Sequence, residues 1–531
     1  MKSPRFRIPT CLKMATQHNV PFPPRRSLHG IFFMAALALV SACQSSEQPP
    51  SAATEATTEA AIMAQFEALS RIPRCSKHEA TVSQYLVDWA KTRGIEVKTD
   101  DAANVVITVP ATSGYENNAA ITLQAHMDMV CQKTSSSTHD FSKDPITLVR
   151  NGDYLTADQT TLGADDGIGV ALALTLAEDN TVEHPKLEFL FTTDEEIDMS
   201  GAAALKAGFI TGKYYLNVDS ENEGVVTIGS AGGMQYDIAL PLHFESIPAG
   251  YGAYTVKVDG LVGGHSGMEI GRGGANANKL LAKALDLTIP FRIASFTGGT
   301  AANAITKTSE ASVVMDPSRY GEFQQAIASA LVAFQTEYGA KESGLSLAVE
   351  AAQAPPLAVP EDETKKVLQL VNALPFGVID WSPSLPGQVE TSSNVGIVAT
   401  KTDSLYVRTY NRSALQARLA DTAAEIVAAA SSVGATATLA SSYSPWEPDP
   451  TSTLLATLLA NYKGLYGTDM TVEVVHAGLE CSQIASKFPG VQIVSIGPTL
   501  TGVHTPEERL NVPSTLKVYA LLANIVPSLG N

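Results

Sequence analysis

The sequence is poor in cysteine, in tryptophan and in basic residues. Its 531 residues include five Cys and three Trp, and 36 Lys and Arg stand against 54 Asp and Glu, for a net charge of −18. This acidic balance argues against a nucleic-acid-binding protein, which needs basic patches. The cysteines show no paired spacing, so we expect no disulfide framework and expect Cys75, Cys131 and Cys481 each to be a small buried residue.

A hydrophobic run long enough to cross a bilayer is also missing. The apolar stretch IFFMAALALVSA (31–42) follows a basic segment and has the length of a signal-peptide core rather than of a membrane span. Its end, LVSAC, resembles the lipobox of bacterial lipoproteins, which predicts a leader over residues 1–42 and a lipid anchor on Cys43. Gln44 then favours the outer membrane, with the protein facing the periplasm. An ordinary signal peptide cleaved nearby is the alternative.

Residues 43–61 are rich in Ser, Ala, Thr, Glu and Pro, and we expect a flexible tether there. Beyond it, the length of the chain predicts two domains. Strand-like runs such as NVVITV (104–109), AAITLQ (119–124) and LEFLFTT (187–193) alternate with helical segments. This alternation predicts an α/β catalytic domain with an open, mostly parallel sheet, formed by residues 62–234 and 444–531. Residues 235–443 read as an inserted α+β domain, built from two sandwich-like units.

Several predicted strands of the α/β domain end in carboxylates or imidazoles. The residues concerned are His126, Asp128, Asp165, Asp166, Asp194, Glu195, Glu196, Asp219 and His504. Ligands of open α/β sheets bind outside the carboxyl ends of the strands. Crowded carboxylates repel one another, so this arrangement makes physical sense with divalent cations present. Mixed His and carboxylate ligands favour zinc, with manganese or cobalt as alternatives. Taken singly, each group has an ordinary reading as a helix cap, a solvated charge or a loop histidine.

The motifs QAHMDMV, TTLGADDGIG, TTDEE, LNVDSE, GGHSGMEI, HAGLEC and SIGPTLTGVHTPEE together resemble the carnosinase–aminoacylase–carboxypeptidase G family of co-catalytic zinc metallopeptidases. The resemblance runs from about residue 62 to the C-terminus. It implies that residues 235–443 act as a lid or dimerisation domain. A homodimer is therefore an expectation.

The resemblance also implies a role for each residue of the cluster. His126 and Asp219 would bind one Zn²⁺ and Glu196 and His504 the other, with Asp165 bridging both and its peptide bond to Asp166 in the cis form. Asp128 would orient His126. Glu195 would be the general base that takes a proton from a water bridging the two metals, and His265 would stabilise the oxyanion.

For the substrate, Arg412 would clamp the C-terminal carboxylate, with Arg408 as its competitor. Asn303, Gly478 and Glu480 would line the pocket, and His476 is a weaker candidate.

Asp rather than Glu at position 219 points, within the family, to dipeptides with a free N-terminus. We therefore expect a two-zinc dipeptidase that hydrolyses unblocked dipeptides, including Xaa-His. Two alternatives stay open: an N-acyl amino-acid amidohydrolase of the same family, and a non-catalytic peptide-binding lipoprotein. The intact Glu195 argues against the second alternative, because a binding protein needs no general base.

Overall fold

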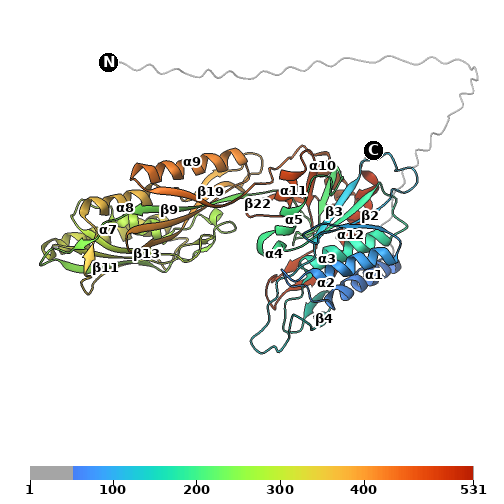
Figure 1. The fold of residues 1–531 in the computed structure, drawn as a ribbon, viewed down its shortest axis with the longest axis horizontal. Coiled ribbons are helices and arrows are strands. Elements are labelled where there is room, and N and C mark those ends of the chain that lie inside the picture. Colours follow the sequence, from blue (N-terminus) through green and yellow to red (C-terminus); the bar gives the residue numbers. More distant parts are fainter. Residues whose placement is uncertain (1–51, 530–531) are drawn as a thin grey trace, which may run out of the picture. The chain divides into compact units, whose positions relative to one another are not determined.

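A computed structural model describes residues 52–529 of the chain. Two large sheets, of eight and nine strands, dominate it, and each packs against helices around its own hydrophobic core (Figure 1). The predicted fold class, an α/β protein with an open, mostly parallel sheet and an inserted α+β part, is confirmed.

The first sheet has the order β1-β2-β6-β3-β7-β23-β8-β22. Its strands are β1 (Glu96–Thr99), β2 (Val105–Val109), β3 (Ile121–His126), β6 (Leu187–Thr192), β7 (Tyr214–Asn217), β8 (Val225–Ser230), β22 (Thr471–Val475) and β23 (Gln492–Ser495). The pairs β3–β6, β3–β7 and β7–β23 are parallel. Every residue of β3 and β6 is buried, as expected for strands covered on both faces.

Helices pack on both faces of this sheet. They are α1 (Ala52–Ser70), α2 (Ala80–Thr92), α3 (Ala164–Glu178), α4 (Glu195–Asp198), α5 (Ser200–Ala204), α10 (Thr453–Tyr466), α11 (Cys481–Lys487) and α12 (Val512–Ser528). Side chains of α1, α2, α3, α10 and α12 share one core, and those of α5 and α11 belong to another. Helix α2 matches its predicted apolar face: Val82, Leu86 and Trp89 are buried, and the chain leaves the helix through Gly94 at φ 69°.

The second sheet has the order β16-β11-β15-β13-β19-β20-β9-β21, with β18 paired to β19. Its strands are β9 (Gly232–Pro241), β11 (Gly252–Asp259), β13 (Arg292–Gly298), β15 (Ser309–Met315), β16 (Ser346–Ala351), β18 (Gly377–Trp381), β19 (Val389–Thr400), β20 (Ser404–Ser413) and β21 (Thr436–Tyr443). The helices α6 (Ala277–Leu285), α7 (Tyr320–Tyr338), α8 (Glu361–Ala373) and α9 (Gln416–Ser432) contribute to a single core with it. The expected two units are therefore halves of one sheet, joined where β13 pairs with β19.

Short elements complete the structure. Three small sheets contain β4 (Leu148–Asn151), β5 (Tyr154–Ala157), β24 (Leu500–Thr501) and β25 (Arg509–Asn511); β10 (Glu245–Ser246) and β17 (Leu357–Ala358); and β12 (Gly264–His265) and β14 (Ala304–Ile305). Two 3₁₀ turns are η1 (Ile270–Arg272) and η2 (Pro317–Arg319). The β24–β25 hairpin matters for the site because His504 lies in its loop. The domain boundaries at 235 and 443 stay predictions.

One prediction about the N-terminal part needs correction. Residues 52–61, expected to be part of a flexible tether, form the first half of α1. Their Ala-rich composition favours a helix, and the buried Ile62, Phe66 and Leu69 of the following turns fix that helix on the core. The predicted leader and the rest of the tether lie outside the described residues. Within residues 52–529, none of the helices has the length and apolar character needed to cross a membrane.

The cysteine prediction is wrong for two residues. Cys75 and Cys131 form a disulfide, with their Cα atoms 5.6 Å apart, and both side chains are only partly buried. They lie 56 residues apart in sequence, so their spacing gives no sign of the pairing. A parallel bridge between Cys75 and Met129 brings the two segments together. Cys481 keeps a free, buried thiol, as predicted.

Candidate metal centre and active site

The order of strands in the first sheet gathers the predicted ligands. In the register of the parallel β3–β6 pair, His126 stands opposite Thr192, and α4 with Glu195 and Glu196 follows immediately. On the other side of β3, strand β7 ends two residues before Asp219. Because parallel strands end at the same edge of a sheet, groups far apart in the sequence meet there.

Asp165, at the start of α3, occupies the middle of the cluster. Its Oδ1 lies 3.1 Å from His126 Nε2, and its Oδ2 lies 3.1 Å from His504 Nε2. Its peptide bond to Asp166 is cis, as expected. Asp166 instead accepts backbone N–H groups from His126 and Gly169. Asp165 thus presents one oxygen to each histidine, which is the arrangement required of a bridging carboxylate.

The remaining two predicted ligands lie at opposite ends of Asp165. Asp219 Oδ1 is 3.4 Å from His126 Nε2, and Glu196 Oε2 is 2.8 Å from His504 Nε2. Groups of ligand atoms within 4.8 Å of one another include His126 with Asp165 and Glu196, and His126 with Asp166 and Asp219. The two groups share His126, and one of them contains Asp166 rather than Asp165. The five residues predicted as ligands nevertheless lie in one cluster, because Asp165 contacts both His126 and His504.

The electrostatics of the cluster fit divalent cations. Burial raises the pKa of Asp219 to about 7, although the charge of His126 opposes this. Burial also raises the pKa of Glu195 well above its usual range. Glu196 Oε1 is buried and has no hydrogen-bond partner among residues 52–529. Crowded carboxylates with an unused oxygen, together with two imidazoles, form a donor set that suits zinc.

Asp128 lies behind His126 and connects it to α4. Its Oδ1 is 3.3 Å from His126 Nδ1 and accepts the N–H of Glu195 at 3.1 Å. Burial by itself raises the pKa of Asp128, but its contacts with His126, Ser76 and the backbone of Glu195 together outweigh burial and bring the pKa to about 2. An ionised carboxylate is therefore held against the imidazole, which is the usual way to orient a metal-binding histidine.

Two charged residues near the site were missed by sequence reasoning. Arg74 is buried and donates to the carbonyl oxygens of Met127, Asp128 and Gly163. Glu508 accepts the N–H groups of the four residues 162–165 at the start of α3. Glu508 belongs to the TPEE stretch after His504. Its position close to a predicted ligand could have indicated that it lies near the site. Arg74 is an isolated basic residue in a loop and gives none.

Of the two arginines proposed to bind the substrate, only one is paired with a carboxylate. Arg408 forms a two-pronged ion pair with Asp237, at 2.6 and 2.8 Å. The buried Arg412 stacks on Tyr410, 4.0 Å from its ring centroid, and donates to the hydroxyl of Tyr443 at 3.1 Å. Arg412 Nε has no hydrogen-bond partner within residues 52–529. Arg412 is thus the arginine with donors to spare for a carboxylate.

The other predicted pocket residues adjoin the loop 476–480. His476 bonds to Ser392 at 2.7 Å, and burial lowers its pKa to about 3. Gly478 lies beside Tyr443, where an added Cβ would stand 3.1 Å from the ring. Glu480 accepts from Gln124 and Thr192, both at 2.7 Å, while its Oε1 is buried without a partner in the described part of the chain.

His265 and Asn303 lie together, away from the metal ligands in sequence. The backbone carbonyl of Asn303 accepts the N–H of Ser266, next to His265, and the Asn303 side chain is exposed. Burial and the charge of Arg412 lower the pKa of His265. An added Cβ on Gly267 would stand 2.6 Å from the carbonyl oxygen of His476, so the His265 loop packs against the 476–480 loop. No contact joins His265 to the metal ligands in the described residues.

Residues 122–528 match the family model "Peptidase family M20/M25/M40", and the chain therefore belongs to this family. It is an enzyme, a metallopeptidase that hydrolyses peptide bonds. The chain is 35% identical, over 87% of its length and 96% of the relative's, to the cytosol non-specific dipeptidase of Escherichia coli (strain K12). The structure of the aminoacylhistidine dipeptidase from Vibrio alginolyticus matches with a TM-score of 0.86 and 34% identity, covering 88% of this chain and 96% of that one.

These comparisons confirm the resemblance to bacterial peptidase D, the aminoacyl-histidine dipeptidase, that the motifs indicated. An aminopeptidase from Bacillus cereus, with a TM-score of 0.51 and 17% identity over 88% of this chain and 98% of that chain, shares the fold alone.

The predicted location is corrected by the same comparisons. We expected an exported lipoprotein, anchored by lipid and facing the periplasm, but the E. coli relative is named a cytosol enzyme. The alignments with both relatives cover the enzyme part of the chain. They give no support for a lipid anchor. The prediction was wrong because it rested on twelve apolar residues and a cysteine, a short pattern that carries no information about the rest of the chain.

Proposed function

We propose that this protein is a two-zinc dipeptidase that cleaves dipeptides with a free N-terminus, including Xaa-His. The single observation that carries the proposal is the position of Asp165, which offers one carboxylate oxygen to His126 and the other to His504, each at 3.1 Å. The names of two similar proteins, a dipeptidase and an aminoacylhistidine dipeptidase, support the same substrate class.

The proposed ligand sets are His126 and Asp219 for one metal and Glu196 and His504 for the other, with Asp165 shared. When bound, two zinc ions would acidify the attacking water and polarise the scissile carbonyl group. Manganese or cobalt could take the same ligands. Asp128 keeps the His126 ring in place, since its carboxylate is itself fixed by the backbone of α4.

Glu195 is the proposed general base. It stands at the start of α4, next to the ligand Glu196, and burial raises the pKa of its carboxyl group well above the usual range. A carboxylate with a raised pKa accepts a proton from water more readily and can return it to the leaving amine. Glu195 would therefore move the proton from the water to the amine nitrogen of the product.

The two ends of the dipeptide would bind to the loop 476–480 and its neighbours. Arg412 would hold the C-terminal carboxylate, helped by Gly478, which leaves space beside Tyr443. Glu480, buried near the metal cluster with an unused oxygen, would accept the substrate's ammonium group. Asn303 and His265 would act from the region of the small β12–β14 sheet, with His265 stabilising the oxyanion. A lid or dimerisation role for residues 235–443, and a homodimer, belong to this proposal.

The comparisons do not favour either alternative function. An N-acyl amino-acid amidohydrolase would act on blocked substrates, whereas the similar proteins are dipeptidases. A non-catalytic binding protein would leave Glu195 without a task.

The test compares Ala-His with N-acetyl-Ala-His on zinc-loaded protein. We expect rapid release of histidine from the free dipeptide only, and a loss of about 10²–10⁴-fold in kcat for Glu195→Ala with unchanged metal content. Glu67→Gln, an exposed residue on α1, is the matched control and should behave like the wild type. Cleavage of the acetylated substrate alone would replace the proposal with the amidohydrolase.

A further inference from the structure

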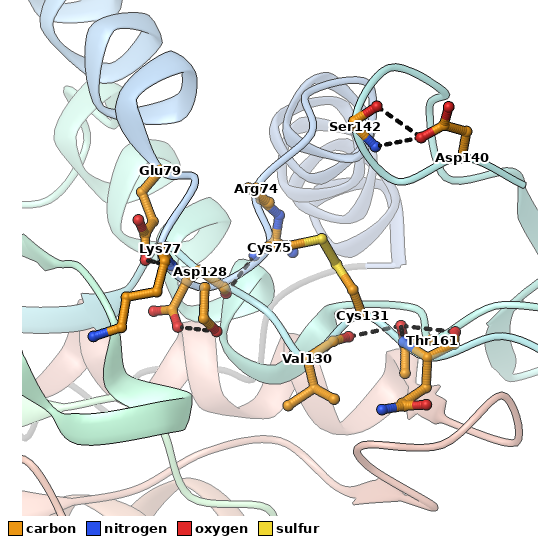
Figure 2. Close-up of a disulfide and its surroundings, with 12 residues drawn as sticks. Arg74, Cys75, Lys77, Glu79, Asp128, Val130, Cys131, Asp140, Ser142 and Thr161 are labelled. Carbon is orange, nitrogen blue, oxygen red and sulfur yellow. Dashed lines mark hydrogen bonds between the residues drawn. A yellow bond between two sulfur atoms is a disulfide. The ribbon is translucent and has the colours of Figure 1, made fainter.

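The loop between α1 and α2 lies against the segment that follows β3. Cys75 in this loop is joined to Cys131 by the disulfide, as Figure 2 shows. Two backbone hydrogen bonds run beside it: Met129 N–H donates to Arg74 O at 3.0 Å, and Ser76 N–H donates to Met129 O at 3.4 Å. The disulfide and these bonds fasten the loop to the chain one to three residues beyond Asp128.

Ser76, the residue after Cys75, touches the carboxylate that orients His126. Its hydroxyl donates to Asp128 Oδ2 at 2.7 Å. The same carboxylate accepts the N–H groups of Glu195 at 3.1 Å and Glu196 at 3.4 Å, and lies 3.3 Å from His126 Nδ1. Ser76 is thus the side chain that completes the set of donors around Asp128.

The loop also holds the turn that leads into α4. Glu79 Oε1 accepts the N–H of Lys77 at 2.8 Å and that of Asp194 at 3.1 Å. Lys77 Nζ pairs with the carboxylate of Asp194 and, at 3.2 Å, with Asp198 (Figure 2 shows Lys77 and Glu79). Asp194 has φ 57° and directly precedes Glu195. Residues 74–79 therefore contact both the support of His126 and the turn that carries Glu195 and Glu196.

We propose that Ser76 is a positioning residue of the metal centre and that the Cys75–Cys131 disulfide sets how well it performs this task. The inference rests on the proposed metal-dependent function. A hydroxyl that donates to Asp128 fixes which oxygen faces the imidazole, and the disulfide limits the movement of the loop that carries the hydroxyl. With the disulfide opened, the loop keeps its two backbone bonds and the contacts of Arg74, Lys77 and Glu79, but it loses its covalent tie beside Ser76. Ser76 can then move away from Asp128. Partners of this kind typically change metal affinity by about 10- to 100-fold.

The two cysteines are partly exposed, so the bond is accessible to reductants. A water-soluble phosphine can open it: the phosphine gives two electrons to the disulfide and takes an oxygen atom from water, leaving two thiols and a phosphine oxide. The reductant is then removed without air, so that it does not compete for zinc. Reduction provides a reversible perturbation of the loop in the unmodified chain.

The experiment measures zinc affinity of the metal-free protein by competition with a chromophoric chelator, alongside kcat and KM for Ala-His. We expect Ser76→Ala to weaken zinc binding by about 10- to 100-fold and to lower kcat more than it changes KM. Ser76→Thr, which keeps the hydroxyl, should restore both. Ser83→Ala is the matched control: Ser83 is a buried serine of α2 whose hydroxyl donates to the carbonyl of Ala103, away from Asp128.

The double variant Cys75→Ser and Cys131→Ser should weaken zinc binding in the same direction, and reduction of the wild type should reproduce it. Reduction should change nothing further in the double variant. The inference is overturned if these changes lower thermal stability while zinc affinity stays that of the wild type, which would make the disulfide a purely structural staple. If the wild type binds two zinc ions but cleaves no dipeptide, the proposed function fails while the zinc affinities still decide this inference.

Discussion

On β20, two arginines four residues apart differ in what surrounds them. The fork of Arg408 is already occupied by Asp237, whereas Arg412 has a stacked, buried guanidinium with an unpartnered Nε among the described residues. The spacing in the sequence could not separate them, because both point to the same face of an alternating strand. The contacts of each side chain separate them at once.

Arg412→Lys should therefore raise KM for free dipeptides by about 10- to 100-fold, since a hydrogen bond to a charged group is worth ~1.5–3 kcal/mol and lysine cannot form the two-pronged contact. The value of kcat should change little. Steady-state kinetics with Ala-His measures this, and Ala-His amide, which lacks the carboxylate, should lose the difference between variant and wild type. Arg408→Lys is the control. An equal rise of KM in that variant would mean that the proposal assigns the substrate carboxylate to the wrong arginine.

Among the secondary-structure elements, the start of α3 depends on a carboxylate from a distant part of the chain. Glu508 accepts the N–H groups of residues 162–165 at 2.8 to 3.3 Å, just where a helix leaves donors without partners. Asp165 is one of these residues, so the anchor of the helix also fixes the proposed bridging ligand.

Glu508→Gln should lower the melting temperature of the metal-free protein by a few degrees and weaken zinc binding. The amide can accept with one oxygen only, and each buried donor left without a partner costs ~1–3 kcal/mol. Thermal unfolding and zinc titration check both effects. The neighbouring Glu507→Gln is the control, because Glu507 is exposed and accepts from Thr505. An effect on stability without any effect on zinc would separate the helix anchor from the metal site.

The sequence predicts local elements of the structure but not the contacts between distant segments. Strands β2, β3, β6 and β7 and helix α2 follow from periodicity, because their burial patterns are local. The candidate residues His126, Asp165, Glu196, Asp219 and His504 were singled out because they lie near the ends of predicted strands or the start of a helix. The family resemblance then implied their roles as ligands. The disulfide and the contacts of Arg74 and Glu508 were missed, since each joins segments that only the folded chain brings together. No local pattern marks such long-range pairs, although the TPEE stretch after His504 does place Glu508 near a predicted ligand.

At the scale of the whole molecule, the buried acids of the site couple stability to pH. Burial raises the pKa of Asp219 to about 7 and that of Glu480 to about 8 in the metal-free protein. Between about pH 4, where these groups titrate in the unfolded chain, and these raised values, the folded state holds more protons than the unfolded state. The free energy of unfolding must therefore fall as the pH rises through this range. His126, whose pKa is raised by Asp219 and Asp128 against the effect of burial, acts in the same direction above about pH 6.5.

Metal binding should oppose this trend, because cations favour the ionised carboxylates and displace their protons. We expect the melting temperature of chelator-treated protein to fall from pH 5 to pH 8, and the stabilisation by zinc to grow over the same interval. Thermal unfolding of metal-free and zinc-loaded protein at pH 5, 6.5 and 8 tests this. Asp219→Asn, which removes one of the acids, should flatten the dependence of the metal-free form. If the difference in melting temperature between zinc-loaded and metal-free protein stays constant with pH, these carboxyl groups do not lose protons when the metals bind.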